Sequence, residues 1–192
     1  ESNFTALVRD VLFSSKSGET AGGSYGLGKA VLWLFSGLSM VMFNSSLSQP
    51  DPREDSPRLV GRTRLPTHKS EDGDTVYQGH GWFGENPGGA DSDEGSGRPE
   101  SVWGDTAEDL AESPHLPRPD QAGTAIQVDD FRVPTAEGRL EDVELGKQIT
   151  QKSIEGCRPA IFRDNLEVTV ETDDETYKAT LEANQQYEQF SA

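Results

Sequence analysis

Residues 22–45, GGSYGLGKAVLWLFSGLSMVMFNS, carry the strongest structural pattern of the chain. The pattern opens with closely spaced glycines, which allow positive φ angles and a close approach of the backbone to a ligand. The run from Leu27 to Phe35 is apolar and predicts a buried helix that ends near Gly37. Residues 38–44 are short and apolar, which is typical of a buried strand. We therefore expect the helix and the strand to anchor the glycine loop in a packed core.

Apolar spacing along the rest of the chain predicts further helices and strands. Helices are expected at residues 3–13, 102–111 and 139–155. Strands are expected at residues 58–65, 75–83, 123–131 and 166–170, with charged turns at 70–74 and 173–175. Because short turns join the strands, we expect an α/β (α+β sandwich) fold with a mixed, largely antiparallel sheet and helices on one face.

The uneven distribution of apolar residues predicts two ordered parts. Residues 1–83, which include the glycine loop, are expected to form the first part. Residues 84–99, GENPGGADSDEGSGRP, combine glycines with acidic residues and are expected to be a flexible acidic linker. Residues 100–192 are expected to form a second αβ segment with a polar tail.

The charge of the chain limits its partners. The 192 residues include 17 Lys and Arg against 34 Asp and Glu, which gives a net charge of −17. Such a negative field repels nucleic-acid phosphates, so we expect no direct binding of nucleic acid. The acidic residues are spread over the whole chain, which would suit a high-salt cytoplasm, where screening removes self-repulsion.

Hydropathy and cysteine content indicate where in the cell the protein is located. Residues 30–44 carry no charge, but this run is shorter than the roughly 20 apolar residues of a membrane span, so no membrane insertion is expected. The single cysteine, Cys157, excludes an internal disulfide and a cysteine-based zinc site. These features favour a cytoplasmic protein.

Residues that could ligate a metal ion are poorly placed in the sequence. Asp129 and Asp130 are adjacent, so on a strand they would face opposite sides of the sheet. The three histidines are far apart and show no ligand spacing. We therefore expect no metal ligands within the chain.

The glycine loop matches the P-loop motif only in part. Gly23, Gly28 and Lys29 fit the pattern G-x-x-x-x-G-K-[ST]. The next residue is Ala30, which lacks the hydroxyl group that would hold Mg²⁺. The motif must also follow a buried strand directly, and the preceding residues 14–22, SSKSGETAG, do not fit one. A P-loop is therefore disfavoured.

The same loop contains a nucleophile-elbow pattern, G-x-S-x-G, at Gly22, Ser24 and Gly26. A serine hydrolase with Ser24 as nucleophile is one alternative. This motif also needs a preceding strand, and the pattern is common by chance in loops rich in glycine and serine. Labelling of Ser24 by a fluorophosphonate probe would identify such an enzyme.

A cradle for the phosphates of a nucleotide is a third interpretation. Successive backbone N–H groups in a glycine-rich loop, together with the start of a helix, bind anions. The polar segment before the glycines is typical of a lid that closes over a ligand. The candidate binding residues are Gly22, Gly23, Ser24, Tyr25, Gly26, Leu27, Gly28 and Lys29.

The stretch SGETAGGSYGLGKAVLWLFSGLSMVMFNS resembles the second glycine box of the GHKL superfamily of ATPases, with the pattern G-x-x-G-x-G at Gly23, Gly26 and Gly28. This superfamily includes ATP-dependent heat-shock chaperones, type II topoisomerase B subunits, MutL and sensor histidine kinases. The resemblance implies an incomplete Bergerat-type fold over residues 1–83. The blocks GTAIQVDDF and PAIFRDNLEVTV resemble parts of the larger prokaryotic members.

The resemblance also implies an activity. Backbone amides from Gly22 to Gly28 would surround the phosphates of ATP, and Lys29 would add charge at the γ-phosphate or lie in solvent. Members of the family hold Mg²⁺ and activate water with residues upstream of this box. The resemblance thus implies ATP-driven lid closure, a homodimer and an ATPase in a longer protein, with no hydrolysis by residues 1–192 alone.

An interaction module without enzymatic activity is the alternative from another class. In such a protein the glycines would serve only the turn before the helix. The protein would then be indifferent to nucleotide, which separates this alternative from the ATP-binding hypothesis.

Overall fold

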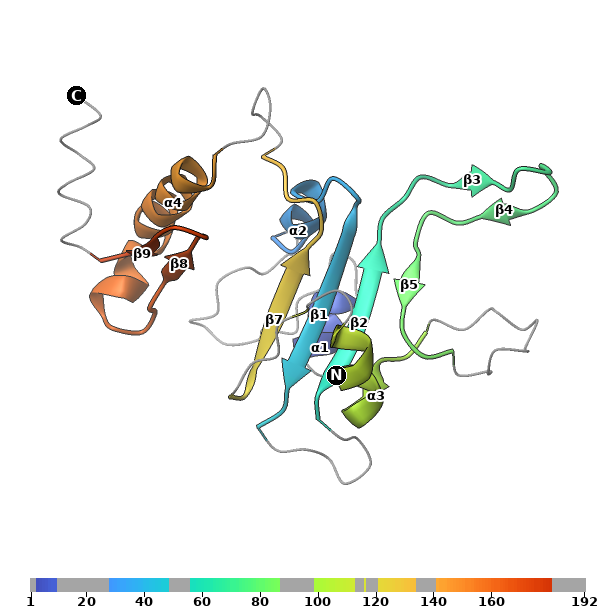
Figure 1. The fold of residues 1–192 in the computed structure, drawn as a ribbon, viewed down its shortest axis with the longest axis horizontal. Coiled ribbons are helices and arrows are strands. Elements are labelled where there is room, and N and C mark those ends of the chain that lie inside the picture. Colours follow the sequence, from blue (N-terminus) through green and yellow to red (C-terminus); the bar gives the residue numbers. More distant parts are fainter. Residues whose placement is uncertain are drawn as a thin grey trace. The chain divides into compact units, whose positions relative to one another are not determined.

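The computed structural model describes residues 3–9, 28–48, 56–86, 99–112, 116, 121–133 and 141–180 of the chain. They belong to two compact units, Glu1–Pro134 and Thr135–Ala192, which Figure 1 shows. The first unit extends past the expected linker at residues 84–99, because strands before and after that segment join one sheet. Residues 87–98 of the linker lie outside the described residues.

The first unit is built on a five-stranded sheet whose described pairings are all antiparallel. Its strands are β1 (Met40–Ser46), β2 (Arg58–Thr63), β5 (Trp82–Phe83), β6 (Val102–Trp103) and β7 (Gly123–Val128). The strand order is β5-β2-β1-β7, and β6 also pairs with β2. A hairpin of β3 (His68–Lys69) and β4 (Val76–Tyr77) extends away from this sheet (Figure 1). The predicted α+β class with a largely antiparallel sheet is confirmed.

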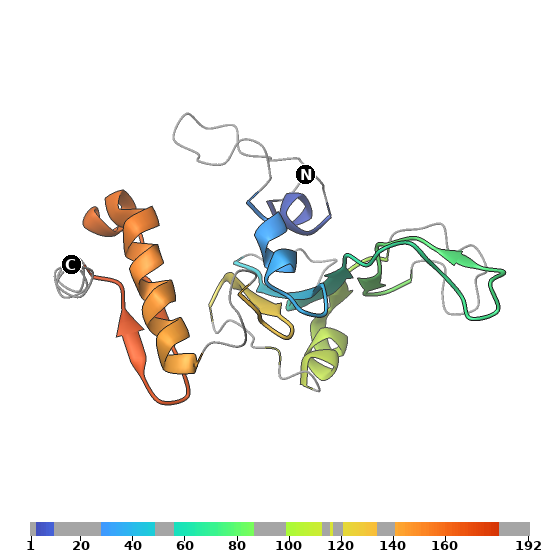
Figure 2. The same ribbon diagram turned by 90° about the horizontal axis from the view of Figure 1, so that it is seen from above.

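Helices cover both faces of this sheet, as Figure 2 shows. They are α1 (Asn3–Val8), α2 (Ala30–Leu34) and α3 (Gly104–Glu112). Trp33 of α2 packs with Val41 and Phe43 on one face, where α1 also lies, and α3 packs against Met42 on the other face. We expected helices on one face of the sheet only, and the structure has them on both faces. The reason is that β1 is buried at consecutive positions, so both of its sides need cover.

The second unit is a long helix with a hairpin against it. Its elements are α4 (Asp142–Phe162), β8 (Thr169–Glu171) and β9 (Thr176–Lys178). Val170 pairs with Tyr177, which confirms the predicted charged turn between them. Ile154, Ile161 and Ala179 form the core of the unit. Neither α4 nor any other helix among the described residues has the length and apolar content that a membrane crossing requires.

Candidate functional site

Two residues of the glycine loop, Gly28 and Lys29, belong to the described part of the chain. The other candidate residues, Gly22–Leu27, lie outside it. Gly28 is exposed, and a Cβ atom at this position would meet no other atom within 4 Å. Packing within the described residues therefore does not require a glycine here.

The start of α2 lacks the groups that usually satisfy a helix N-terminus. Lys29 occupies the N-cap position with helical angles, φ −65° and ψ −21°, and makes no side-chain capping bond. The first turn contains no acidic residue. The amide groups of Val31 and Leu32 already bond back to the Gly28 and Lys29 carbonyl oxygens, at 3.3 Å each. The partial positive charge of this helix end is therefore not offset by a nearby carboxylate on the helix itself.

Lys29 connects the start of α2 to α1. Its ammonium group donates a hydrogen bond to the carbonyl oxygen of Ala6, and the side chain is half-buried. The carbonyl groups near the C-terminus of a helix favour a positive charge. Lys29 was expected either to add charge at the γ-phosphate or to lie in solvent. Its contact with α1 belongs to neither of these roles.

Arg62 of β2 fixes the end of α1. Its guanidinium donates to the carbonyl oxygens of Val8, at 2.9 Å, and Arg9, at 3.3 Å. It also lies 5.7 Å from the ring centre of Trp33 and 4.8 Å from that of Trp82. The indole N–H of Trp33 returns a hydrogen bond of 2.9 Å to the Arg62 carbonyl. The end of α1, the body of α2 and strand β2 are thus joined around one buried cation.

Sequence reasoning missed Arg62, although a signal was present. Strand alternation places Arg62 on the same side of β2 as Val60, which is fully buried. An arginine on the apolar side of a strand indicates an internal partner, because a buried charge must be hydrogen-bonded or paired.

Trp82 is partly buried against the α1/α2 core, and the Arg62 guanidinium lies over its ring.

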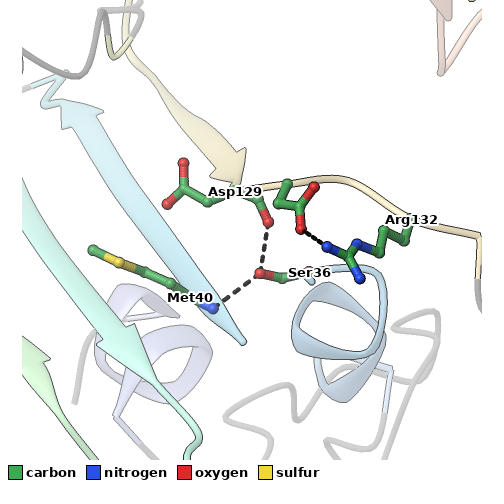
Figure 3. Close-up of polar contacts among 5 residues, drawn as sticks. Ser36, Met40, Asp129 and Arg132 are labelled. Atoms are coloured by element: carbon green, nitrogen blue, oxygen red, sulfur yellow. Dashed lines mark hydrogen bonds and ion pairs between the residues drawn. The ribbon is translucent and has the colours of Figure 1, made fainter. Parts of the chain in front are cut away.

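The C-terminal end of α2 is hydrogen-bonded to the end of β7, as Figure 3 shows. The Ser36 hydroxyl donates to the Asp129 carbonyl oxygen at 2.8 Å and accepts the Met40 amide N–H at 2.9 Å. The amide of Arg132 donates to the Phe35 carbonyl oxygen at 2.8 Å. Asp130 forms an ion pair with Arg132, beside the backbone of α2. Helix α2 is therefore held at both ends.

Gly37 lies against the ion pair at this junction. A side chain at this position would have to displace the Asp130 carboxylate and the Arg132 guanidinium, which are the ends of flexible side chains. Asp130 itself adopts a left-handed backbone conformation with φ of 51°, which ends the strand. The predicted strand at residues 123–131 therefore ends earlier, at Val128.

The remaining candidate groups that the structure describes do not form a second site. Among the described residues, no group of three or more His, Cys, Asp or Glu side chains lies together as a metal ion would require. Asp129 accepts a hydrogen bond from Gln127 at 2.7 Å, while Asp130 pairs with Arg132, so the two carboxylates have separate partners. Ser24, the alternative nucleophile, lies outside the described residues.

Shifted pKa values do not point to a catalytic group either. A hydrogen bond from the Ser70 hydroxyl lowers the pKa of Asp72, and a hydrogen bond from Lys152 lowers the pKa of Glu155. Both residues are exposed, and each partner is two or three residues away in sequence. These shifts reflect local turn and helix contacts.

Comparison with known proteins gave no relatives. A scan against models of protein families found no match, and searches of curated proteins and of solved structures found none.

Proposed function

We propose that this chain binds the triphosphate group of ATP through residues 22–29, as part of a GHKL-type nucleotide-binding protein. One observation carries the proposal: the glycine-rich segment leads directly into α2, whose N-terminus has no side-chain cap and no acidic residue in its first turn. A helix end of this kind favours an anion, because its dipole presents partial positive charge that no carboxylate on the helix offsets.

The surroundings of α2 support this role. Trp33 packs α2 onto the central strand β1, Lys29 holds its start against α1, and Ser36 holds its end against β7. A helix fixed at both ends loses little further conformational entropy when a ligand binds, which favours affinity. Among the described residues, no atom lies within 4 Å of the place that a side chain at Gly28 would take, which would leave room for a phosphate group.

These contacts suggest separate roles for the backbone amide groups and for Lys29. Backbone amide groups bind the phosphates, and Lys29 positions the start of α2 by its contact with Ala6. Mg²⁺ would neutralise phosphate charge. The resemblance places its protein ligand upstream, and no described cluster of metal-ligating side chains replaces it.

The test is a pair of matched glycine substitutions. Gly28 and Gly156 are both exposed, and a Cβ atom added at either position would meet no described atom within 4 Å. We expect Gly28→Val to weaken binding of Mg·ATP and of inorganic tripolyphosphate at least tenfold, because the branched side chain blocks the backbone. We expect Gly156→Val, in α4, to leave binding unchanged. Isothermal titration calorimetry measures both ligands, and circular dichroism confirms the fold of each variant.

Tripolyphosphate separates the phosphate cradle from any adenine pocket, since it carries only the phosphates. Binding of tripolyphosphate that Gly28→Val removes and Gly156→Val preserves supports the proposal. If the wild-type chain binds neither ligand, or if both variants bind equally, the glycine segment is only a turn before α2. The interaction-module alternative then becomes the better explanation, and the exposed side chains of Val31 and Leu34 on α2 favour it.

A further inference from the structure

Strand β7 forms one edge of the sheet in the first unit. It pairs with β1 along Gly123–Val128, and among the described residues no strand lies on its other side. The opposite side of the sheet ends in β5 and β6, which have two residues each. Short edge strands protect a sheet from further pairing. The sheet therefore has one short edge and one long edge.

The hydrogen-bond pattern shows which backbone groups of β7 face outward. The Asp129 amide donates to the Met40 carbonyl oxygen at 3.3 Å, continuing the register in which Gln127 lies opposite Met42. In an antiparallel pair, such hydrogen-bonded positions alternate with positions whose N–H and C=O groups point away. The outward groups of β7 are therefore those of Thr124, Ile126 and Val128.

Within Gly123–Val128 this edge lacks the sequence features that usually prevent pairing. The sequence GTAIQV contains no charged residue and no proline, and its register with β1 runs without a bulge. Natural edge strands generally carry one of these features to prevent edge-to-edge association. Ile126, at the centre of the outward set, is 40% exposed. The strand is thus built to accept a neighbour.

A second apolar feature lies on the same side of the sheet. Ile126 is opposite Phe43, which belongs to the face that α2 covers. Figures 1 and 2 both show α2 over the ends of β1 and β7. The outer surface of α2 and the turn after it expose Val31 at 47%, Leu34 at 64% and Leu38 at 59%. A strand pair alone buries little area, so these side chains would add to an interface.

We propose that β7 is an interface between two copies of this chain, paired antiparallel about a twofold axis at Ile126. In this register Ile126 lies opposite the partner's Ile126, and Thr124 lies opposite the partner's Val128. Each outward-facing residue therefore lies opposite an outward-facing residue of the partner. The N–H group of each can donate a hydrogen bond to the C=O group of the other. The proposal depends on β7 and not on nucleotide binding.

Charge placement favours this twofold register. Asp129 would lie opposite the partner's Gly123, so no two carboxylates face each other across the strand pair. Dimer formation is still opposed by the long-range repulsion between two chains of net charge −17 each. Salt screens that repulsion, since the Debye length falls from about 10 Å at 0.1 M to about 3 Å at 1 M. We therefore expect the dimer fraction to rise with KCl concentration.

The first test measures mass by sedimentation equilibrium of the full chain across a KCl series. The wild type is expected to form a dimer at high salt. Ile126→Lys is expected to remain a monomer, because the two lysines would lie opposite each other at the axis. Val76→Lys is the control: Val76 is 57% exposed on the β3–β4 hairpin, and its replacement should leave the dimer intact. A monomeric wild type at all salt concentrations, or a dimer that survives Ile126→Lys, overturns the proposal.

A cross-linking experiment tests the register, and does not depend on how well Ile126→Lys folds. In a Cys157→Ser background, Ile126→Cys places thiols at the axis with Cα atoms about 5.5 Å apart, within the range for a disulfide. Thr124→Cys places them about 14 Å apart, four residues along the strand, which is too far. Disulfide dimers from Ile126→Cys alone support the twofold pairing. Equal yields from both variants contradict it.

Discussion

Arg62 shows how one residue can organise a core. It is a buried cation on the apolar side of β2, and it carries hydrogen bonds to two carbonyl groups at the end of α1. The helix dipole places partial negative charge at this end, and the faces of Trp33 and Trp82 add cation–π attraction. The residue therefore replaces its lost hydration with several directed contacts.

We expect Arg62→Met to destabilise the first unit by about 2–4 kcal/mol, because it retains the aliphatic bulk but leaves the Val8 and Arg9 carbonyl groups without their donor. Urea unfolding followed by tryptophan fluorescence measures the loss. Arg132→Met is the control, since its guanidinium side chain is 67% exposed and pairs with Asp130 at the surface. An exposed pair contributes about 0–1 kcal/mol. Equal losses in both variants would show that burial of Arg62 adds nothing.

Local patterns predicted the elements around α2 well. The helix expected at residues 27–35 and the strand expected at 38–44 correspond to α2 (Ala30–Leu34) and β1 (Met40–Ser46). Their apolar runs are continuous, so the sequence signal is strong. The strand expected at 75–83 instead divides into β4 and β5, although the Leu65 amide still donates to the Gly79 carbonyl between them, at 2.6 Å.

Contacts between distant segments could not be predicted in the same way. The pairing of β1 with β7 joins Ser45 to Thr124, which local propensity does not encode. The junction at Ser36 and Gly37 depends on that pairing, because its partners come from the end of β7. For the candidate site, the sequence located the glycine segment and the helix after it. The contact of Lys29 with Ala6 was not foreseen, because it depends on where α1 packs.

The attachment of α2 to β7 has a measurable consequence. Ser36→Ala removes a bond to the Asp129 carbonyl and leaves the Met40 amide without its side-chain acceptor. We expect a loss of about 1–3 kcal/mol in the free energy of unfolding, as for buried polar groups that lose their partners. Chemical denaturation measures it. Ser153→Ala is the control, because Ser153 is only partly buried and its hydroxyl bonds back to the Ile149 carbonyl within α4. A loss no larger than that of the control would mean that the junction is not a stabilising contact.

The whole molecule carries a charge that opposes its own folding. Its net charge is −17, and compact states with such charge are destabilised by self-repulsion. The ion pairs Lys152–Glu155 and Lys178–Glu167 are exposed and offset little of this. Helix α3 adds a local conflict, because its last turn contains Asp109 and Glu112 and no basic residue. Carboxylates at a helix C-terminus oppose the helix dipole.

We therefore expect KCl to raise the urea midpoint of unfolding, and neutral substitutions on α3 to reproduce part of that gain at low salt. Asp109→Asn with Glu112→Gln should stabilise the chain by roughly a few tenths of a kcal/mol for each residue, and the gain should shrink in high salt because the removed repulsion is already screened. Asp105→Asn is the matched control: Asp105 lies in the first turn, where a carboxylate is favourable, so its loss should lower stability. An unchanged midpoint across the salt series, or stabilisation by all three substitutions alike, would show that charge placement does not limit the stability of this fold.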